Sequence, residues 1–379
     1  MSYVNDTMGL LNFTSSNYSM KSNISRQCNF KYDDQYSSVF SLEFVINLFI
    51  LPIICTAGAI LSIICFIVFM QKQMRYSSLN VYLAALSLFD TILLIDTMIQ
   101  FGLLQGCWEL GYTYNMVCRL FWKASLITWP ISYMAQTCSV WTCVAITIDR
   151  YFHVKFPLKS KIYCTPQRAL TSVIIVVVCS IIYRIPTIFE FKLTQCGSLA
   201  WTKLRESSFY QRYYLFIGYS LFIFLIPWTI MIVLNIIIVQ DVHRAYQMRQ
   251  TMLVSSGQGE QDKSRATLMA LTMTVSFALF NILAAVCFVD EPFGFQMPDS
   301  IDTLGNLLVC FNSAFNVIIY VLFSPRFRLM FVITLCGKDS RWMRWLKADR
   351  RLSSTKPTEE FQQSSNSRRS CQSNQNVKF

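Results

Sequence analysis

The stretch Ala124–Ile148, ASLITWPISYMAQTCSVWTCVAITI, followed at once by Asp149-Arg150-Tyr151, decides the fold of this chain. The run carries no charge and is longer than the ~20 residues that an α-helix needs to cross a bilayer. An acid and a base therefore stand side by side where an apolar span meets a basic segment beginning at His153. Ionisable groups at a membrane edge are costly, which favours a functional role over a solvated helix end.

Composition extends this conclusion to the whole chain. Of 379 residues, 54% are hydrophobic and only 14% are charged, which is typical of proteins that reside in lipid. Uncharged or nearly uncharged runs recur at 44–70, 79–104, 124–148, 169–189, 213–240, 266–289 and 303–324. The sequence predicts an all-α membrane protein, a bundle of seven transmembrane helices.

Orientation follows from the distribution of Lys and Arg. These residues are concentrated in 152–168, 241–265 and 325–379, whereas 105–118 contains none. Because cytoplasmic loops carry the excess of positive charge, we expect a multi-pass plasma-membrane protein with its amino terminus outside. The net charge of +12 then indicates contact with anionic inner-leaflet lipid and not binding to nucleic acid.

The segment before the first span resembles an extracellular tail. It holds four N-x-S/T glycosylation acceptors, Asn5, Asn12, Asn17 and Asn23. We expect a glycosylated tail over 1–43, a receptor domain over 44–336 and a largely disordered cytoplasmic tail over 337–379. The four cysteines expected outside are Cys28, Cys107, Cys118 and Cys196. They allow three complete pairings, of which we favour Cys118 with Cys196, tying the second outer loop to the third span.

A carboxylate lies in the middle of the second span. Asp90 needs a partner or a cation there. Ser139 in the third span and Asn312 and Asn316 in the seventh could join it in holding sodium or in sharing a proton. The alternative is a polar network that only holds helices together. No other cofactor is expected.

Three further features lie at the inner side or in the fifth span. Pro227 offers the fifth span a place to bend. A short amphipathic helix should follow Pro325 and end at Cys336, which is either a lipidation site or a free cysteine. The tail carries many Ser and Thr residues, which suggests regulation by phosphorylation.

The chain shows no zinc pair, phosphate loop or nucleophile elbow, so we do not expect an enzyme.

Together these residues resemble a rhodopsin-class (class A) G-protein-coupled receptor over about 44–336. The resemblance implies that Asp149 holds Arg150 in the inactive state, that Tyr151 completes the triplet, and that Pro157 and Leu158 contact a heterotrimeric G protein. A receptor kinase and arrestin would then act at the tail. Within the class, the chain is similar to invertebrate FMRFamide-type neuropeptide receptors, and the segments that carry this likeness are 59–64, 74–80, 135–140, 183–186 and 266–269.

The resemblance also implies switch residues, several of which depart from the class. The switch set is Pro227, Phe277, Asn281, Asn316 and Tyr320. Asn281 stands where the class has tryptophan, and Leu283 stands where it has proline. Ala59, Val317 and Asn235 replace an asparagine, a proline and a tyrosine, so the details of switching differ from those of the class.

The expected ligand is an amidated, RFamide-like extracellular peptide. Ser132 and Cys310 replace the residues that bind monoamines and retinal in related receptors, so neither ligand is expected. Acids are predicted to receive the arginine of the peptide, and aromatic and amide side chains to form the pocket wall. These candidates are Glu190, Asp290, Glu291 and Asp302, with Trp129, Tyr133, Gln136 and Tyr183.

Three alternatives stay open. A chemosensory receptor of the same fold for small environmental molecules is the nearest. A transporter or channel is disfavoured because the chain shows no pair of broken helices in an inverted repeat. A non-signalling scaffold is the third.

Overall fold

The computed structural model describes residues 42–103, 116–194, 199–252, 258–293 and 299–336. The glycosylation acceptors Asn5, Asn12, Asn17 and Asn23 and the tail beyond 336 lie outside this part. So does Cys196, and the side chain of Cys118 is also outside it, so their disulfide stays a prediction. The chain divides into two compact units, Met1–Phe323 and Ser324–Phe379.

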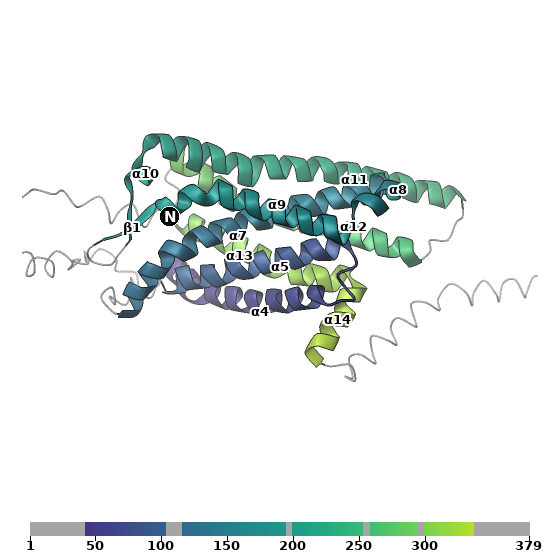
Figure 1. The fold of residues 1–379 in the computed structure, drawn as a ribbon, viewed down its shortest axis with the longest axis horizontal. Coiled ribbons are helices and arrows are strands. Elements are labelled where there is room, and N and C mark those ends of the chain that lie inside the picture. The colour runs from purple at the N-terminus through teal and green to yellow at the C-terminus, as the bar shows by residue number, and fades with distance from the viewer. Residues whose placement is uncertain (1–41, 104–115, 195–198, 253–257, 294–298, 337–379) are drawn as a thin grey trace, which may run out of the picture. The chain divides into compact units, whose positions relative to one another are not determined.

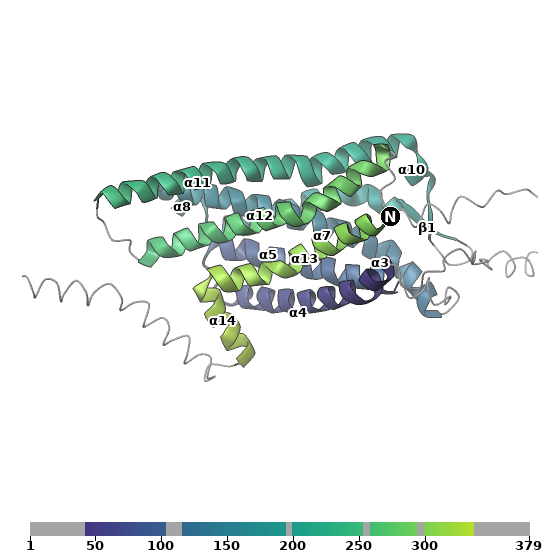
Figure 2. The same cartoon turned by 180° about the vertical axis from the view of Figure 1, so that it is seen from behind.

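The first unit is a bundle of long helices that run side by side (Figures 1 and 2). Their bounds, with short segments at their ends, are α3 Leu42–Val45, η1 Ile46–Ile50, α4 Leu51–Met70, α5 Ser78–Thr97, η2 Met98–Leu103, α7 Met116–Lys155, α8 Pro157–Tyr163, α9 Pro166–Arg184, η3 Ile185–Phe189, α10 Lys203–Glu206, η4 Tyr210–Gly218, η5 Ser220–Leu225, α11 Ile226–Met252, α12 Gln258–Phe293 and α13 Asp299–Phe323.

Seven of these helical segments are long and apolar enough to cross a membrane, which confirms the predicted seven-helix bundle. They are Ile46–Met70, Ser78–Phe101, Leu120–Lys155, Pro166–Phe189, Tyr210–Ala245, Ser264–Val286 and Ser300–Phe323. The second and third spans are the most enclosed, and the fourth and fifth are the least. The polar residues of the second and third spans therefore lie at the centre of the bundle.

Several hydroxyl side chains inside the spans are satisfied within their own helix. Thr91 Oγ1 donates to the Ser87 carbonyl oxygen at 2.7 Å, and Thr142 Oγ1 donates to the Cys138 carbonyl oxygen at 2.7 Å. Because lipid offers no hydrogen bonds, such i−4 bonds let polar residues enter a span at little cost.

Local signals set the helix starts near the loop after the third span, which the sequence predicts to lie on the inner side. Pro157 and Pro166 each occupy the first position of a helix, where the missing N–H is not needed. The Thr165 side chain caps α9 by accepting a hydrogen bond from the Arg168 backbone N–H at 3.4 Å. The short α8 and the turn after it thereby bring Cys164 back toward α7.

The first and seventh spans approach closely at Gly58. A Cβ added at this position would lie 2.8 Å from Ala314 Cβ and 3.0 Å from Leu94 Cδ1. Small residues permit such contact between membrane helices. The buried Leu51, Cys55, Ala59, Leu94 and Cys310 form the adjoining apolar core.

A short hairpin follows the fourth span and is not visible in the sequence pattern. Strands β1 Phe191–Leu193 and β2 Leu199–Trp201 pair antiparallel, with Phe191 opposite Trp201. Phe191 and Leu199 pack on Phe121 and Trp122 at the start of the third span. The hairpin is therefore held against α7 by apolar contacts.

The first half of the fifth span, which the sequence predicts to be its outer half, is π-helical. Segments η4 and η5 precede α11, and Pro227 is the second residue of the α-helix that follows. The predicted irregularity at Pro227 therefore coincides with the junction between the π-helical and α-helical parts. π-Helical turns are rare and frequently mark functional sites.

The second unit begins with α14, Pro325–Cys336. The helix has the predicted bounds, and the Ser324 hydroxyl caps it by accepting from the Phe327 backbone N–H at 3.2 Å. Its two charged residues, Arg326 and Arg328, both lie in the first turn. The side chain of Cys336 lies outside the described residues, so its lipidation stays a prediction.

Candidate functional site

The inner end of α7 carries a buried ion pair. Asp149 and Arg150 are each 5% exposed. Arg150 donates to Asp149 Oδ2 through Nε at 3.1 Å and also through Nη2. His153 lies one turn further along, with Nδ1 3.4 Å from the same Oδ2 and 2.9 Å from the Asp149 carbonyl oxygen. The structure thus joins Asp149 and Arg150 in the arrangement that the class resemblance implies for an inactive state.

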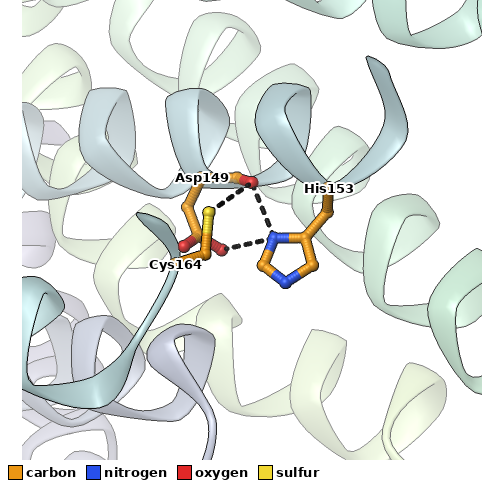
Figure 3. Close-up of side chains that lie close together, drawn as sticks. All are labelled: Asp149, His153 and Cys164. Carbon is orange, nitrogen blue, oxygen red and sulfur yellow. Dashed lines mark hydrogen bonds and ion pairs between the residues drawn. The ribbon is translucent and has the colours of Figure 1, made fainter. Parts of the chain in front are cut away.

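A cysteine from the following loop completes this cluster (Figure 3). Cys164 Sγ lies 3.9 Å from the Asp149 carbonyl oxygen. Burial, and then the nearby Asp149, raise the pKa of the Cys164 thiol to about 11. The thiol is therefore protonated at neutral pH when no metal is bound.

The residues predicted to meet a G protein present an apolar surface next to this cluster. Pro157 is exposed, and Leu158 on α8 is 82% exposed. The Tyr151 ring is half-buried and makes an edge contact with Phe156, with ring centroids 6.2 Å apart. An exposed leucine on a short helix at the end of a bundle is a suitable contact for a partner protein.

A second ion pair connects the third and fifth spans at the same end. Lys155 Nζ lies 3.2 Å from Asp241 Oδ2, and the Lys155 side chain is more exposed than that of Asp241. Exposed pairs of this kind contribute about 0.2–1 kcal/mol. The pair therefore reports the relative position of α7 and α11 more than it stabilises the fold.

The structure brings three of the four predicted sodium-binding residues together in the middle of the bundle. Ser139 Oγ donates to Asp90 Oδ1 at 3.1 Å, and Asn316 Nδ2 donates to Asp90 Oδ2 at 2.8 Å. Ser313 also interacts with this carboxylate. Asn312 is buried on the same helix as Asn316. A carboxylate among hydroxyl and amide groups has the oxygen ligands that a hard cation such as sodium prefers.

The predicted switch residues of the sixth and seventh spans are all buried. Asn281 Nδ2 donates to the Phe277 carbonyl oxygen at 2.8 Å, so the residue in the tryptophan position of the class bonds to its own helix. Tyr320 packs edge-on against Phe69 of α4, with centroids 5.2 Å apart. The tyrosine thus links the seventh span to the first.

In the outer half of the bundle, aromatic side chains enclose a buried guanidinium. Arg184, the last residue of α9, is 2% exposed. Its Cζ lies 5.0–5.3 Å from the ring centroids of Tyr133, Tyr183 and Tyr219. Nε donates to Thr137 Oγ1 at 2.9 Å, whereas Nη2 has no hydrogen-bond partner among the described residues. The predicted wall residues Tyr133 and Tyr183 therefore share one centre.

Gln136 belongs to the same group, since its Oε1 accepts a hydrogen bond from the Tyr219 hydroxyl at 3.3 Å. The group formed by Arg184, Tyr133, Gln136, Tyr183 and Tyr219 is called the Arg184 cage below. Cation–π contacts reach about 2 kcal/mol when the cation is desolvated. They offset part of the cost of burying this charge, but one N–H direction of the guanidinium remains available to an acceptor.

Glu190 lies directly beyond the cage and already has protein partners. Its Oε1 accepts a hydrogen bond from the Tyr210 hydroxyl at 2.7 Å, and Oε2 lies 4.0 Å from Arg205 Nε. Burial raises the pKa of Glu190 above its usual value, although Tyr210 and Arg205 act in the opposite direction. Glu190 is 2% exposed, so its carboxylate is less accessible to a ligand than its loop position suggests.

The remaining ligand-binding candidates are Trp129, Asp302, Asp290 and Glu291. Trp129 stacks on Phe191 of the hairpin, with centroids 4.4 Å apart. Asp302 is half-buried near the start of α13. Asp290 and Glu291 lie in the last turns of α12, and their side chains are outside the described residues.

Asp96 is a buried acid at the outer end of the second span. Ser132, Thr128 and Gln100 surround its carboxylate. Oδ1 nonetheless has no hydrogen-bond partner among the residues that the structure describes. The outer half of the bundle therefore holds one acid and one base, each with a free bonding direction.

Arg184 is the main residue that sequence reasoning missed. The available signal was its position as an ionisable residue inside the run 169–189. Such a residue is by default functional when it is buried in a membrane span. Ser313 was also missed, although it lies three residues before Asn316 and hence on the same helix face.

The chain resembles known proteins over most of its length. The family model described as serpentine type 7TM GPCR chemoreceptor Srw matches residues 47–338. The FMRFamide receptor of Drosophila melanogaster is 28% identical over 301 residues, covering 77% of this chain and 54% of that receptor. The FMRFamide peptide receptor frpr-18 of Caenorhabditis elegans is 30% identical over 287 residues, covering 71% of this chain and 64% of the receptor.

A vertebrate relative is more distant. Galanin receptor 2a of Danio rerio is 24% identical over 301 residues, covering 77% of this chain and 78% of the receptor. The chain thus spans between half and two thirds of the two FMRFamide receptors that it matches. The resemblance to FMRFamide-type receptors is confirmed. Since the family match runs through all seven spans, the chain belongs to the Srw family of serpentine seven-transmembrane G-protein-coupled receptors.

Proposed function

We propose that this chain is a plasma-membrane receptor, with its amino terminus outside, that binds an amidated RFamide-like peptide and activates a heterotrimeric G protein. The observation that carries the proposal is the Arg184 cage, a buried site with an unsatisfied donor in the outer half of a receptor whose relatives are named FMRFamide receptors. The receptor signals by changing conformation and performs no catalysis.

The chemistry of the ligand fits these groups. An amidated carboxyl terminus offers a carbonyl oxygen, which would accept the free N–H of Arg184, and a phenylalanine ring would pack on Tyr133, Tyr183 or Tyr219. The arginine of the peptide would be repelled by Arg184, so its partner is Asp96, whose Oδ1 has no hydrogen-bond partner within the part of the chain that the structure describes. Glu190 acts through Tyr210 and Arg205 and positions the cage.

Activation is a population shift. The peptide binds the active arrangement more tightly, Arg150 leaves Asp149, and the surface around Leu158 meets the G protein. The sixth span lacks the proline at which the class bends. We therefore place the hinge in the π-helical part of the fifth span. Receptor kinase and arrestin act on the tail.

A peptide panel tests the proposal. Cells expressing the chain with a promiscuous G protein and a calcium reporter are exposed to FMRFamide, its free acid, and FMRFamide with norleucine in place of arginine. We expect the amide to be the most potent. Asp96→Asn should weaken the arginine peptide by at least about tenfold, equivalent to 1.4 kcal/mol, and should hardly affect the norleucine peptide. Glu206→Gln, at an exposed acid of α10, is the matched control for loss of one outer acid.

The same panel can refute the proposal. If no RFamide peptide raises the reporter signal although surface labelling confirms expression, the peptide assignment is wrong. Asp96 would lose its role if both peptides weakened equally in Asp96→Asn.

The second candidate is a chemosensory receptor for small environmental molecules, which the description of the matching family model favours. The named peptide receptors among its relatives count against it. A response to small molecules in the absence of a response to peptides would select this alternative.

A further inference from the structure

Three side chains with metal-binding atoms meet at the inner end of the third span (Figure 3). Asp149 and His153 are one turn apart on α7, and Cys164 comes from the turn between α8 and α9. One ligand atom from each of the three lies within 4.8 Å of the others. Two separate segments of the chain thus contribute to one cluster.

The distances suit a tetrahedral metal ion. Oxygen and nitrogen ligands at 2.0–2.1 Å from Zn²⁺ lie roughly 3.3 Å from each other at the tetrahedral angle. The observed separation of Asp149 Oδ2 and His153 Nδ1 is 3.4 Å. A sulfur ligand at about 2.3 Å needs a separation of roughly 3.5 Å from each, which a rotation of the half-buried Cys164 side chain can supply.

The donor set selects the class of metal. A thiolate, an imidazole and a carboxylate are the three ligand types that zinc uses in proteins, whereas Mg²⁺ and Ca²⁺ prefer sites made only of oxygen. With three protein ligands, the fourth position is left to water, as in an open zinc site.

Arg150 competes for the same atoms. Its two N–H groups point at Asp149 Oδ2, and Nη2 lies 3.3 Å from His153 Nδ1. A dication and a guanidinium cannot both use these atoms, because the two positive charges would lie a few ångströms apart in a partly buried site. Metal binding and the Asp149–Arg150 ion pair therefore exclude each other.

We propose that Asp149, His153 and Cys164 form a zinc site that fills only when Arg150 leaves Asp149. Linkage then requires that zinc favours the released state of Arg150, and that release of Arg150 favours zinc by the same factor. The consequence for signalling, a higher basal activity with zinc, rests on the proposed function; the binding itself does not.

The full-length receptor, purified in detergent under reducing conditions, is titrated with Zn²⁺ against a fluorescent zinc indicator. We expect one ion bound per chain. His153→Ala and Cys164→Ser should each weaken binding by more than the roughly 10–100-fold that loss of an outer hydrogen-bond partner costs at zinc sites. Excess Mg²⁺ should not compete.

The chain supplies matched controls. His243 is the second of its two histidines and is exposed, and Cys179 is an exposed free cysteine. His243→Ala and Cys179→Ser should leave the affinity unchanged. Arg150→Ala should tighten binding, because it removes the competitor.

A labelling experiment on the unmodified receptor avoids any dependence on whether the variants fold. Zinc should slow the reaction of maleimide with Cys164, located by peptide mass spectrometry. The proposal would be overturned if His153→Ala and Cys164→Ser bound zinc as tightly as the unmodified receptor. It would also be overturned if zinc did not protect Cys164 from maleimide, or if Arg150→Ala bound zinc more weakly than the unmodified receptor. Since no peptide is present, these outcomes are independent of whether RFamide peptides activate the receptor.

Discussion

Replacing Asp149 with asparagine should raise the basal activity of the receptor about tenfold. The substitution keeps the shape of the side chain but removes the charge that receives both N–H groups of Arg150. Hydrogen bonds to a charged group contribute about 1.5–3 kcal/mol, and neutral ones about 0.5–1.5 kcal/mol. The midpoints of the two ranges differ by about 1.3 kcal/mol, and each 1.4 kcal/mol is a factor of ten in population, so loss of one such difference gives about tenfold.

The assay is nucleotide exchange without agonist. Membranes with equal surface amounts of each variant are mixed with a set of purified heterotrimeric G proteins, and the rate of guanine-nucleotide uptake is measured. The matched control is Asp241→Asn, which removes an acid at the same end of the bundle from a more exposed pair with Lys155. That pair contributes about 0.2–1 kcal/mol, so the control should change the rate by about fivefold at most.

Two results would refute the reasoning. A basal rate in Asp149→Asn at or below that of the unmodified receptor would mean that release of Arg150 does not limit G-protein engagement. An equal rise in Asp241→Asn would mean that general loosening of the inner face, and not the Asp149–Arg150 pair, sets the basal rate.

Four other outcomes follow from the same geometry. Arg150→Ala should abolish nucleotide exchange while peptide binding to intact cells persists; normal exchange would contradict the role of the triplet. Sodium, compared with potassium, should weaken agonist affinity, and Asp90→Asn should remove this effect in a radioligand competition assay. Burial raises the pKa of Glu190 above its usual 4.5, so the stability that the protonated group provides below that pH is lost as pH rises through the folded-state pKa. The melting temperature should therefore fall as pH rises, and Glu190→Gln should flatten this fall. An unchanged profile in the variant would mean that Glu190 is not the source of the fall. Gly58→Val should destabilise the receptor by about 1–3 kcal/mol in a thermal-shift assay, because the first added carbon would already lie 2.8 Å from Ala314 Cβ.

Hydrophobicity was enough to predict the seven spans, because lipid requires each crossing segment to satisfy its own backbone. The helix 325–336 was also predicted, since Pro325 both ends the seventh span and starts the next helix. The helix of the third span is longer than the predicted run 124–148, because α7 continues through charged residues to Lys155. Charges at a helix end do not stop a helix that leaves the membrane.

The hairpin and the π-helical segments could not be predicted in the same way. Strands β1 and β2 have three residues each, too few for an alternating pattern, and they form because Phe191 and Leu199 find apolar partners on α7. No residue rule separates the i→i+5 bonding of the π-helical segments η4 and η5 from i→i+4 bonding.

The candidate site was predicted in part. The Asp90 cluster followed from polar residues in three spans, because a lone carboxylate in a membrane requires partners. The Arg184 cage was not predicted, because its members come from α7, α9 and Tyr219 between η4 and η5, and only the packing of the helices shows that they meet. Likewise, Cys164 is 15 residues from Asp149, and α8 must turn the chain back before the two can meet.

The π-helical outer half of the fifth span has a mechanical consequence. Each turn of a π-helix takes up more residues than a turn of an α-helix, so residues 210–225 hold spare chain length. If these turns tightened to α-helix around a bound peptide, the span would lengthen and α11 would rotate and slide toward the inner face. The Lys155–Asp241 contact, 3.2 Å in the present arrangement, would then break. In this receptor the fifth span would convert a local change of helical pitch in its outer half into a rotation and displacement of its inner end.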